Sequence, residues 1–432
     1  MFSSAPATHA NPPPVSPPVA LARAGQLAPG DTGRFKSFGG LQGFSPSIDG
    51  DNIAFGAFTD GGGGIYAFIG GRLRVVADTA TKVPGTNVNF SFGLPSGSGP
   101  SISGRNVVFL GTNPLEGDGV WVWSDGVLTQ IAGQSTPVPG GTGTFSTFGA
   151  GTGVTPAISG ENVVFNAVTN TTEGIYAFIN GQLRVIADTS TLLPGATRTV
   201  TTFGFGKGVS PAISGENVAF YAQWGFDGEG IYAFINGEFR VIAATGTPIP
   251  GLGGPAFGHF LSPSPAISGE NVVFAETFGI FAMIDGSLRA IATSDIPAPG
   301  SSGGFGAVVG TERRNRPSID GENIAFAAFA LDIGLGVFAL IEGEYCLIAG
   351  ENMPVPGGGG TFFNFNAVFD GGVSPAISGR QVAFVGRPFP TVYLGNGPAT
   401  IPAIPTWGWI ALALLMVVAG TFLIRRRRVA KP

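Results

Sequence analysis

Acidic side chains recur in the stretches that we expect to form long loops, and they are the residues of this sequence best suited to chemistry. They are Asp60, Glu116, Asp118, Glu173, Asp227, Glu229 and Asp332. Carboxylates gathered by one set of loops can bind a cation, a basic peptide or a hydroxyl-rich glycan. Two carboxylates about 5–10 Å apart could also cleave a glycosidic bond, but no spacing in the sequence establishes such a pair. A solvated set of polar loops that only keeps the protein soluble is the simpler alternative.

Few other residues could carry a reaction. The sequence contains two histidines, His9 and His259, which are too few for a histidine metal cluster or a Ser-His-Asp triad. We expect His259 to be a surface loop residue, and we expect no metal and no cofactor. Cys346 is the single cysteine, so an intramolecular disulfide is excluded, and we expect its side chain to be buried as a small apolar group.

The charge balance argues against nucleic acid as a partner. Five of the 22 basic residues lie in the last eight positions, so residues 1–400 hold 17 basic against 27 acidic side chains, a net charge of −10. Binding to phosphates needs clustered lysine and arginine. Arg313, Arg314 and Arg316 form the only basic group before the tail, and we expect all three at the surface.

The elements that position these loops follow from a repeat. The segment Pro-(Ser/Ala)-Ile-(Ser/Asp)-Gly occurs seven times at intervals of 52 to 58 residues, beginning at Pro46, Pro100, Pro156, Pro211, Pro265, Pro317 and Pro375. Repeats of this length that contain several short β-strands are typical of the blades of a β-propeller.

Each copy predicts four short strands. In the third copy, the Pro-Ala-Ile-Ser segment is followed by the apolar run at 163–165, a second run at 175–179, and an alternating segment at 183–186. A two-residue turn, Asn180-Gly181 here, separates the third strand from the fourth, and Asn-Gly or Asp-Gly stands at this position in five of the seven copies.

The spacing of one further pair predicts how the ring closes. After each outer strand an alanine lies seven residues before the proline of a Pro-Gly pair, and the same spacing occurs at Ala22 and Pro29, ahead of the first copy. The last copy has no outer strand of its own. We therefore predict an all-β fold, a seven-bladed β-propeller over residues 19–398, in which an N-terminal strand completes the last blade.

The predicted topology sorts the loops between the two faces of the disc. Turns between the first and second strands and between the third and fourth lie on one face, which we call the turn face. Loops between the second and third strands, and the connections between blades, lie on the other, which we call the variable face. The acidic residues above belong to the variable face. Phenylalanines recur in the blade connections, and we expect them to form core between blades, with sugar-stacking platforms as the alternative: Phe35, Phe38, Phe90, Phe92, Phe145, Phe148, Phe203, Phe205, Phe257, Phe260, Phe362 and Phe365.

The two ends differ from the repeats. Residues 1–18 are rich in proline and predict an extended linker, with no visible signal peptide. Residues 399–432 predict a C-terminal signal whose uncharged stretch, 407–424, is long enough for one transmembrane helix. The arginines that follow it favour a cytoplasmic end: Arg425, Arg426, Arg427 and Arg428.

This C-terminal segment resembles the IPTL-type sorting signals of Gram-negative bacteria, which are related to the PEP-type signals processed by exosortase-like membrane proteases. Ile401 and Pro402 match the opening pair, Ile404 stands where leucine is usual, and Trp407-Gly408 match the aromatic-glycine step. The resemblance implies export, anchoring in the inner membrane, an exosortase-like partner, and cleavage with transfer to the cell surface or matrix.

The repeats are similar to propeller repeats of bacterial surface proteins that carry such signals. A propeller implies a fold and not an activity. We therefore expect an exported, non-enzymatic binding or scaffold module for an extracellular polysaccharide or a surface protein. The alternative is a polysaccharide-active hydrolase or lyase that uses carboxylates of the variable face.

Overall fold

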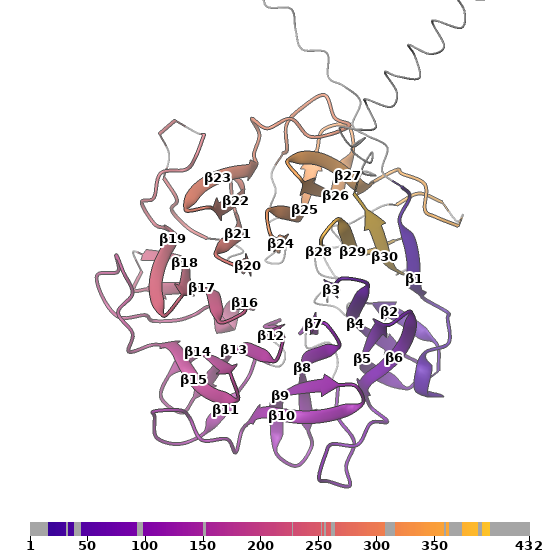
Figure 1. Cartoon of the computed structure of the whole chain (residues 1–432), viewed down its shortest axis with the longest axis vertical. Helices are drawn as coiled ribbons and strands as arrows, with labels where there is room; N and C mark the ends of the chain where they lie inside the picture. Colours follow the sequence, from indigo (N-terminus) through magenta and orange to yellow (C-terminus); the bar gives the residue numbers. More distant parts are fainter. Residues whose placement is uncertain are drawn as a thin grey trace, which may run out of the picture. The chain divides into compact units, whose positions relative to one another are not determined.

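The computed structural model shows seven antiparallel sheets arranged as blades around a centre (Figure 1). It describes residues 16–31, 33–38, 45–92, 98–149, 153–226, 228–251, 253–254, 256–260, 264–306, 316–357, 360–362, 374–387 and 391–397. Within this part of the chain the regular elements are strands and two short 3-10 helices, η1 (Pro29–Asp31) and η2 (Phe205–Lys207). The predicted all-β, seven-bladed propeller is confirmed.

Every blade has a three-residue inner strand and three longer strands, in the order in which they occur along the chain except in blade 7. Blade 1 contains β3 (Ser47–Asp49), β4 (Asn52–Thr59), β5 (Gly62–Ile69) and β6 (Arg72–Asp78). Blade 2 contains β7 (Ser101–Ser103), β8 (Asn106–Asn113), β9 (Gly117–Ser124) and β10 (Val127–Gly133). Blade 3 contains β12 (Ala157–Ser159), β13 (Asn162–Thr169), β14 (Glu173–Ile179) and β15 (Gln182–Asp188). Blade 4 contains β16 (Ala212–Ser214), β17 (Asn217–Trp224), β18 (Gly228–Ile235) and β19 (Glu238–Ala244).

The remaining blades follow the same plan. Blade 5 contains β20 (Ala266–Ser268), β21 (Asn271–Glu276), β22 (Gly279–Ile284) and β23 (Ser287–Ala292). Blade 6 contains β24 (Ser318–Asp320), β25 (Asn323–Ala330), β26 (Gly334–Ile341) and β27 (Glu344–Gly350). Blade 7 contains β28 (Ala376–Ser378), β29 (Gln381–Gly386), β30 (Thr391–Asn396) and, as its outer strand, β1 (Val19–Arg23). Two short strands in blade connections, β2 (Phe35–Phe38) and β11 (Phe145–Thr147), pair with β4 and β13.

The N-terminal strand closes the ring as predicted. β1 pairs antiparallel with β30, with Val19 opposite Leu394 and Arg23 opposite Thr391. This pairing occupies the edge of blade 7 that a chain of seven copies alone leaves open. One detail of the prediction is wrong: β30 ends at Asn396, and because its outer neighbour comes from the other end of the chain, Asn396-Gly397 is not a hairpin turn.

The repeated motif binds neighbouring blades to one another. The glycine N–H at its end donates a hydrogen bond of 2.5–2.9 Å to the serine or aspartate oxygen of the preceding blade, and this occurs at all seven junctions. In six blades the asparagine two residues later donates to the glycine carbonyl of the next blade. We call these contacts the inter-blade ring. They explain why Ser or Asp, followed by Gly, recurs at this position.

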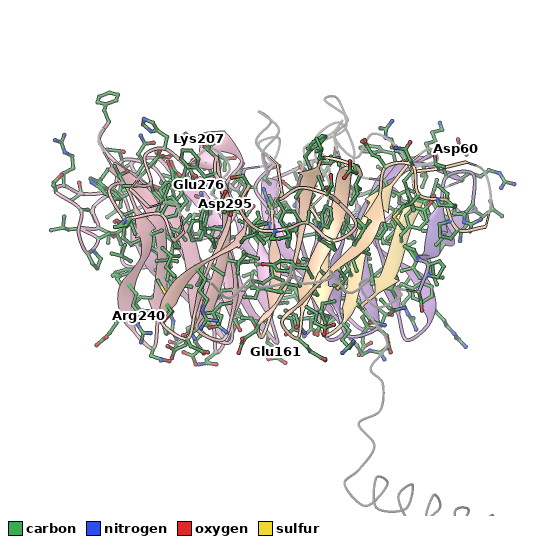
Figure 2. All side chains as sticks on the ribbon, turned by 90° about the horizontal axis from the view of Figure 1, so that it is seen from above. Asp60, Glu161, Lys207, Arg240, Glu276 and Asp295 are labelled. Carbon is green, nitrogen blue, oxygen red and sulfur yellow. The ribbon has the colours of Figure 1, made fainter. Side chains whose placement is uncertain are left out.

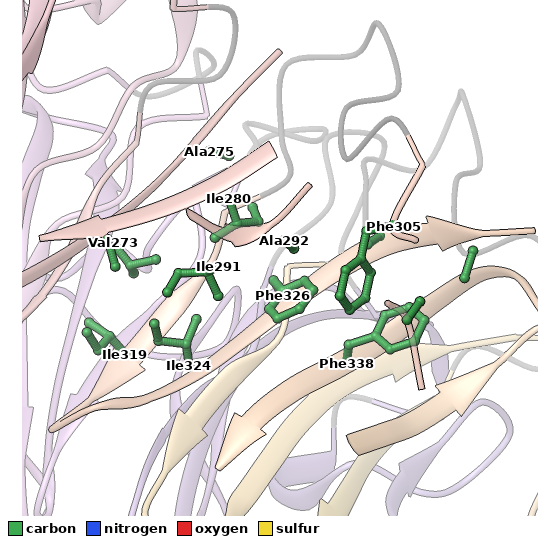
Figure 3. Close-up of a cluster of buried hydrophobic side chains, with 14 of the residues drawn as sticks. Val273, Ala275, Ile280, Ile291, Ala292, Phe305, Ile319, Ile324, Phe326 and Phe338 are labelled. Atoms are coloured by element: carbon green, nitrogen blue, oxygen red, sulfur yellow. The ribbon is translucent and has the colours of Figure 1, made fainter. Parts of the chain in front are cut away.

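Seven hydrophobic clusters fill the seven spaces between adjacent blades. Figure 3 shows the cluster between blades 5 and 6, where Phe305 of the connection meets Phe326 and Phe338 with ring centroids 5.3 and 5.1 Å apart. The same edge-to-face contact joins a connection phenylalanine to an aromatic residue of the third strand in six blades. The predicted role of these phenylalanines as core between blades is therefore confirmed for those that are buried, whereas Phe365 lies outside the described residues.

The predicted C-terminal signal at 399–432, with its transmembrane helix at 407–424, and residues 1–15 of the predicted linker at 1–18 also lie outside the described residues. Within the described ranges, no helix has the length and apolar character needed to cross a membrane.

We expect the connection phenylalanines to contribute strongly to stability. Phe145 is buried and its ring lies edge-to-face on Tyr176 at 4.8 Å. Phe145→Ala should lower the free energy of unfolding by about 3–5 kcal/mol, because the small side chain leaves a cavity between blades 2 and 3. The matched control is Phe226→Ala, which removes an exposed ring and should change it by about 0.5 kcal/mol or less. Equal denaturation midpoints for the two variants would contradict the assignment.

Candidate functional site

The loops of the variable face hold the predicted acidic residues, with the exception of Asp227, which lies outside the described residues. Asp60, Glu116 and Asp332 lie in turns between the second and third strands, and Asp118, Glu173 and Glu229 lie at the start of third strands. In Figure 2 Asp60 and Lys207 mark the variable face, whereas Glu161 and Arg240 lie toward the turn face.

Four of these carboxylates accept hydrogen bonds from backbone N–H groups of blade connections. Asp60 accepts a hydrogen bond from the Arg34 backbone N–H and pairs with Lys36, contacts that lower its pKa. The Ser302 side chain and backbone N–H both donate to Asp332 at 2.6 Å and lower its pKa in the same way. Each carboxylate thus fastens a hairpin to the neighbouring connection.

Glu173 and Glu229 occupy equivalent positions in blades 3 and 4 and have equivalent roles. Glu173 accepts hydrogen bonds from the backbone N–H groups of Phe203 and Phe205. Glu229 accepts one from the backbone N–H of Phe260 at 2.9 Å. No hydrogen bond or ion pair joins two acidic residues in the described ranges, and no group of three potential ligands there could hold a metal ion. The charges of Glu173 and Glu229 nevertheless both act on one phenol, that of Tyr221, and both add to burial in raising its pKa.

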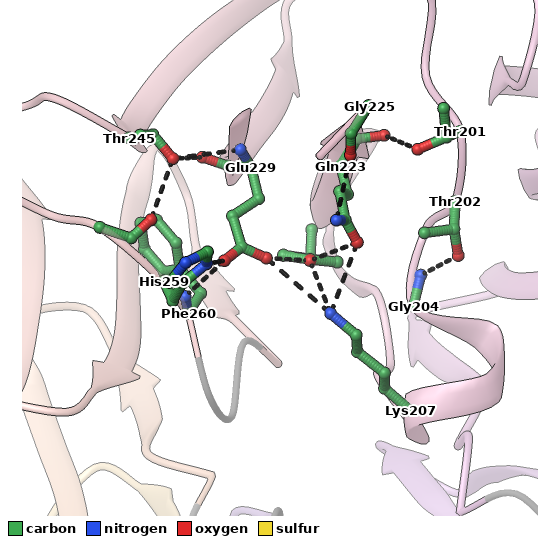
Figure 4. Close-up of polar contacts among 12 residues, drawn as sticks. Thr201, Thr202, Gly204, Lys207, Gln223, Gly225, Glu229, Thr245, His259 and Phe260 are labelled. Carbon is green, nitrogen blue, oxygen red and sulfur yellow. Dashed lines mark hydrogen bonds and ion pairs between the residues drawn. The ribbon is translucent and has the colours of Figure 1, made fainter. Parts of the chain in front are cut away.

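One of them, Glu229, belongs to a larger polar group that we call the blade 4 cluster: Lys207, Tyr221, Gln223, Glu229 and His259 (Figure 4). The Tyr221 hydroxyl donates to one oxygen of Glu229, and Lys207 Nζ lies 3.9 Å from the same oxygen. His259 Nδ1 lies 3.0 Å from the other oxygen. The connections of two blades and two strands of blade 4 supply these side chains.

The cluster has a buried centre and an exposed edge. The Glu229 side chain is 6% exposed, whereas those of Lys207 and His259 are 47% and 82% exposed. Burial and the hydrogen bond to Glu229 raise the pKa of Tyr221 far above the usual range, so the phenol stays protonated at neutral pH. Tyr221 is therefore a hydrogen-bond donor and not a base.

A small recess of about 180 Å³ opens beside the cluster. Gln223, Glu229, Thr245 and His259 contribute polar groups to its lining, and Phe226 contributes an aromatic ring. A site of this kind, with a few polar groups beside an apolar surface, can orient a polar ligand by hydrogen bonds. A second carboxylate, which glycoside hydrolysis requires, is absent from this lining as far as the structure describes it.

The second cavity is the central channel, with a volume of about 200 Å³. The residues that precede the motif prolines line it. Four of them, Thr155, Ser210, Ser264 and Ser374, accept backbone hydrogen bonds across blades through their hydroxyl groups; the Thr155 N–H, for example, donates to Ser210 Oγ at 2.8 Å. Arg316 occupies this position in blade 6. Its guanidinium group crosses the channel and donates to Ser210 Oγ and to the carbonyl oxygens of Gly153 and Gly208.

The structure corrects and extends the sequence predictions at these positions. Arg316 was expected at the surface, but it lies in the channel because its backbone belongs to the start of an inner strand; Arg313 and Arg314 lie outside the described residues. Cys346 is buried as expected, and burial raises its pKa to about 11. His259 is exposed as expected, but its contact with Glu229 was missed.

Sequence reasoning also missed Lys207, Tyr221 and Glu276. Glu276 is buried and accepts a hydrogen bond from the Phe278 backbone N–H. One feature of the sequence could have identified Lys207 and Tyr221: each occurs in one repeat only, and the other copies have different residues at the equivalent positions.

Comparisons with known proteins identify no activity for this chain. Residues 64–275 match the model of a family of unknown function, DUF7453. No curated protein matches the sequence.

Solved structures of low identity are similar in architecture. The β-propeller domain of the Trilobed protease from Pyrococcus furiosus is 10% identical with a TM-score of 0.44, and the match covers 82% of this chain and 92% of that one. A puromycin-hydrolyzing peptidase of Mycobacterium tuberculosis is 14% identical (TM-score 0.43; 88% and 55%). An acylaminoacyl peptidase of Pyrococcus horikoshii is 11% identical (TM-score 0.46; 87% and 54%). This chain thus spans little more than half the length of the two complete peptidases.

We expect tyrosine burial to limit stability in alkali. The pKa values of five of the six tyrosines are raised in the folded protein. Below pH about 10 the folded and unfolded chains are equally protonated at these groups. Above it the unfolded chain releases protons that the folded chain keeps, so the free energy of unfolding should fall by about 1.4 kcal/mol per pH unit for each such tyrosine. Tyrosinate absorbance should therefore rise together with unfolding, and ionisation of most tyrosines in a still-folded protein would contradict this.

We also expect Arg316 to stabilise the ring. Arg316→Met removes three donated hydrogen bonds between blade 6 and blades 3 and 4, and it should lower the free energy of unfolding by about 2–3 kcal/mol. Arg105→Met is the matched control, because Arg105 forms an exposed ion pair with Asp125 that is worth about 1 kcal/mol or less. Denaturation midpoints measure both effects, and an Arg316→Met protein as stable as the control would disprove the role.

Proposed function

We propose that this protein is an exported surface or matrix propeller that binds a ligand on its variable face without catalysis. The observation that carries the proposal is the use of the carboxylates: Asp60, Glu173, Glu229 and Asp332 each accept a backbone hydrogen bond from a blade connection and so hold the loops of this face in place. A catalytic pair needs two carboxylates that face one bond. A binding face needs only rigid loops that differ between blades.

The blade 4 cluster is the part of this face best suited to a ligand. Glu229 contacts His259 and Lys207 from the connections on either side of blade 4, and it leaves both exposed, His259 in the lining of the recess and Lys207 on the other carboxylate oxygen. Pre-organised side chains of this kind lose little freedom when a ligand binds. An extracellular polysaccharide or another surface protein is the class of ligand that we infer.

Export is supported by the C-terminal sequence. The segment that opens with Ile401-Pro402 and continues through an apolar stretch to an arginine cluster resembles an IPTL-type sorting signal. We propose that this signal anchors the protein in the inner membrane until an exosortase-like protease transfers it to the surface.

A polysaccharide-active enzyme is the second candidate. It is favoured by one observation, the contact of His259 Nδ1 with the buried Glu229 carboxylate. A histidine positioned by a carboxylate can act as a general acid or base toward a substrate. Release of reducing or unsaturated sugar ends from matrix material by the wild-type protein, lost in His259→Ala, would favour this candidate.

Fractionation of the organism that makes the protein tests the proposal. We expect the full chain, with a tag inside a turn-face loop, at the cell surface or in the matrix, and mass spectrometry should show a mature C-terminus before residue 407. The Gln223→Ala/His259→Ala variant should bind isolated matrix about tenfold more weakly, because two ligand hydrogen bonds are lost. Glu161→Ala on the turn face is the control. An intact C-terminus in the cytosol, or unchanged matrix binding by the double variant, would refute the corresponding half of the proposal.

A further inference from the structure

Three consecutive blades expose an aromatic ring at the same end of the same hairpin. Phe226 of blade 4 is 94% exposed, Phe278 of blade 5 is 48% exposed, and Phe329 of blade 6 is 43% exposed. All three belong to the turns between the second and third strands, or to the strand ends beside them, and therefore to the variable face. We call them the aromatic row. They differ from the connection phenylalanines, whose rings fill the spaces between blades.

Local contacts hold Phe278 and Phe329, whereas the Phe226 ring, which is 94% exposed, projects from its turn. Phe278 is positioned by the hydrogen bond from its N–H to the buried Glu276. The Phe329 ring lies against the backbone at Gly306, where an added Cβ would approach it to 2.9 Å. Phe226 follows Gly225, which has a positive φ of 66°, and the buried Trp224 lies directly beneath the same turn. These exposed rings are therefore presented by the fold.

The polar groups beside Phe226 complement the hydroxyl groups of a sugar. The recess next to this ring is lined by the Gln223 amide, the Glu229 carboxylate and the His259 imidazole, and its volume of about 180 Å³ suits a single sugar ring. A pyranose has an apolar face of C–H groups, which packs on an aromatic ring, and an edge of hydroxyl groups, which both donate and accept hydrogen bonds.

The charge of the protein and the spacing of the rings select among possible ligands. Residues 1–400 carry a net charge of −10, which repels an acidic polymer. The rings are distributed one to a blade over three blades, whereas the core of a protein–protein interface is contiguous and apolar. A polymer with one apolar face on each unit fits this distribution.

We infer that the aromatic row and the recess together bind a neutral polysaccharide chain, laid across blades 4, 5 and 6 with sugar rings stacked on Phe226, Phe278 and Phe329. This inference rests on the proposed binding function and names its ligand class. The sugar beside Phe226 also occupies the recess, where Gln223 and His259 contact its hydroxyl groups.

The test is electrophoresis of the full chain through native gels that contain hydroxyethyl cellulose, laminarin, galactomannan or alginate. We expect at least one of the three neutral polymers to retard the protein. Phe226→Ala should weaken that binding about tenfold, and the triple variant Phe226→Ala/Phe278→Ala/Phe329→Ala should abolish it. Val127→Ala, which removes an exposed apolar side chain from a turn-face hairpin, is the matched control and should bind as the wild type does. Circular dichroism of each variant checks that it is folded.

Three results would overturn the inference: no retardation by a neutral polymer, retardation by alginate alone, or equal binding by the folded triple variant. Binding of the protein is then measured on matrix treated with periodate, which cleaves sugar diols, and on matrix treated with protease. The two treatments distinguish failure of the polysaccharide inference from failure of the proposed binding function. Binding that survives protease and is lost after periodate supports the inference. Binding that survives periodate and is lost after protease overturns the inference and leaves the proposed function standing. Absence of binding to untreated matrix overturns both.

Discussion

The hydrogen bond between a glycine N–H of one blade and a serine or aspartate oxygen of the blade before it is the contact on which the rest of this structure depends. It recurs at all seven junctions, including the junction between Gly50 and Ser378, whose residues are 328 positions apart in the chain. Inner strands of three residues are too short to hold a sheet in place by pairing alone. Bonds between blades fix their angular positions, and the aromatic clusters can then fill the spaces between them.

Because this ring holds the turn face, the variable face is free to differ between blades. The chain nevertheless uses acidic residues there to keep its loops rigid, as the contacts of Glu173 and Asp332 with backbone N–H groups show. At Asp332 these hydrogen bonds also lower the pKa of the carboxyl, because they stabilise its charged form. In blade 4 the carboxylate that holds the loops, Glu229, also contacts the exposed side chains of Lys207 and His259. The loops there are therefore both rigid and polar at their exposed edge.

Much of the fold could be predicted because its determinants are local and repeated. The Asn-Gly and Asp-Gly turns have positive φ at both residues, such as 52° at Asn180 and 78° at Gly181, which is the reason these residues occur there. The seven-residue spacing between Ala22 and Pro29 predicted the position of the closing strand correctly. The candidate site could be predicted only in part. Glu229 was identified from its loop, but Tyr221 was hidden in an apolar strand and Lys207 in a connection.

The sequence by itself determined the number of blades, their strands, the closure by β1 and the division into two faces, because each of these follows from a pattern that lies within one repeat or between equivalent positions of successive repeats. The contacts between side chains of different blades, by contrast, depend on how the ring is assembled. Arg316 reaches Gly153 across 163 positions of sequence, and His259 reaches Glu229 from the next connection. The physical reason is that ring closure brings together residues from separate blades, and no local pattern of residues encodes the distance across a channel or between two loops.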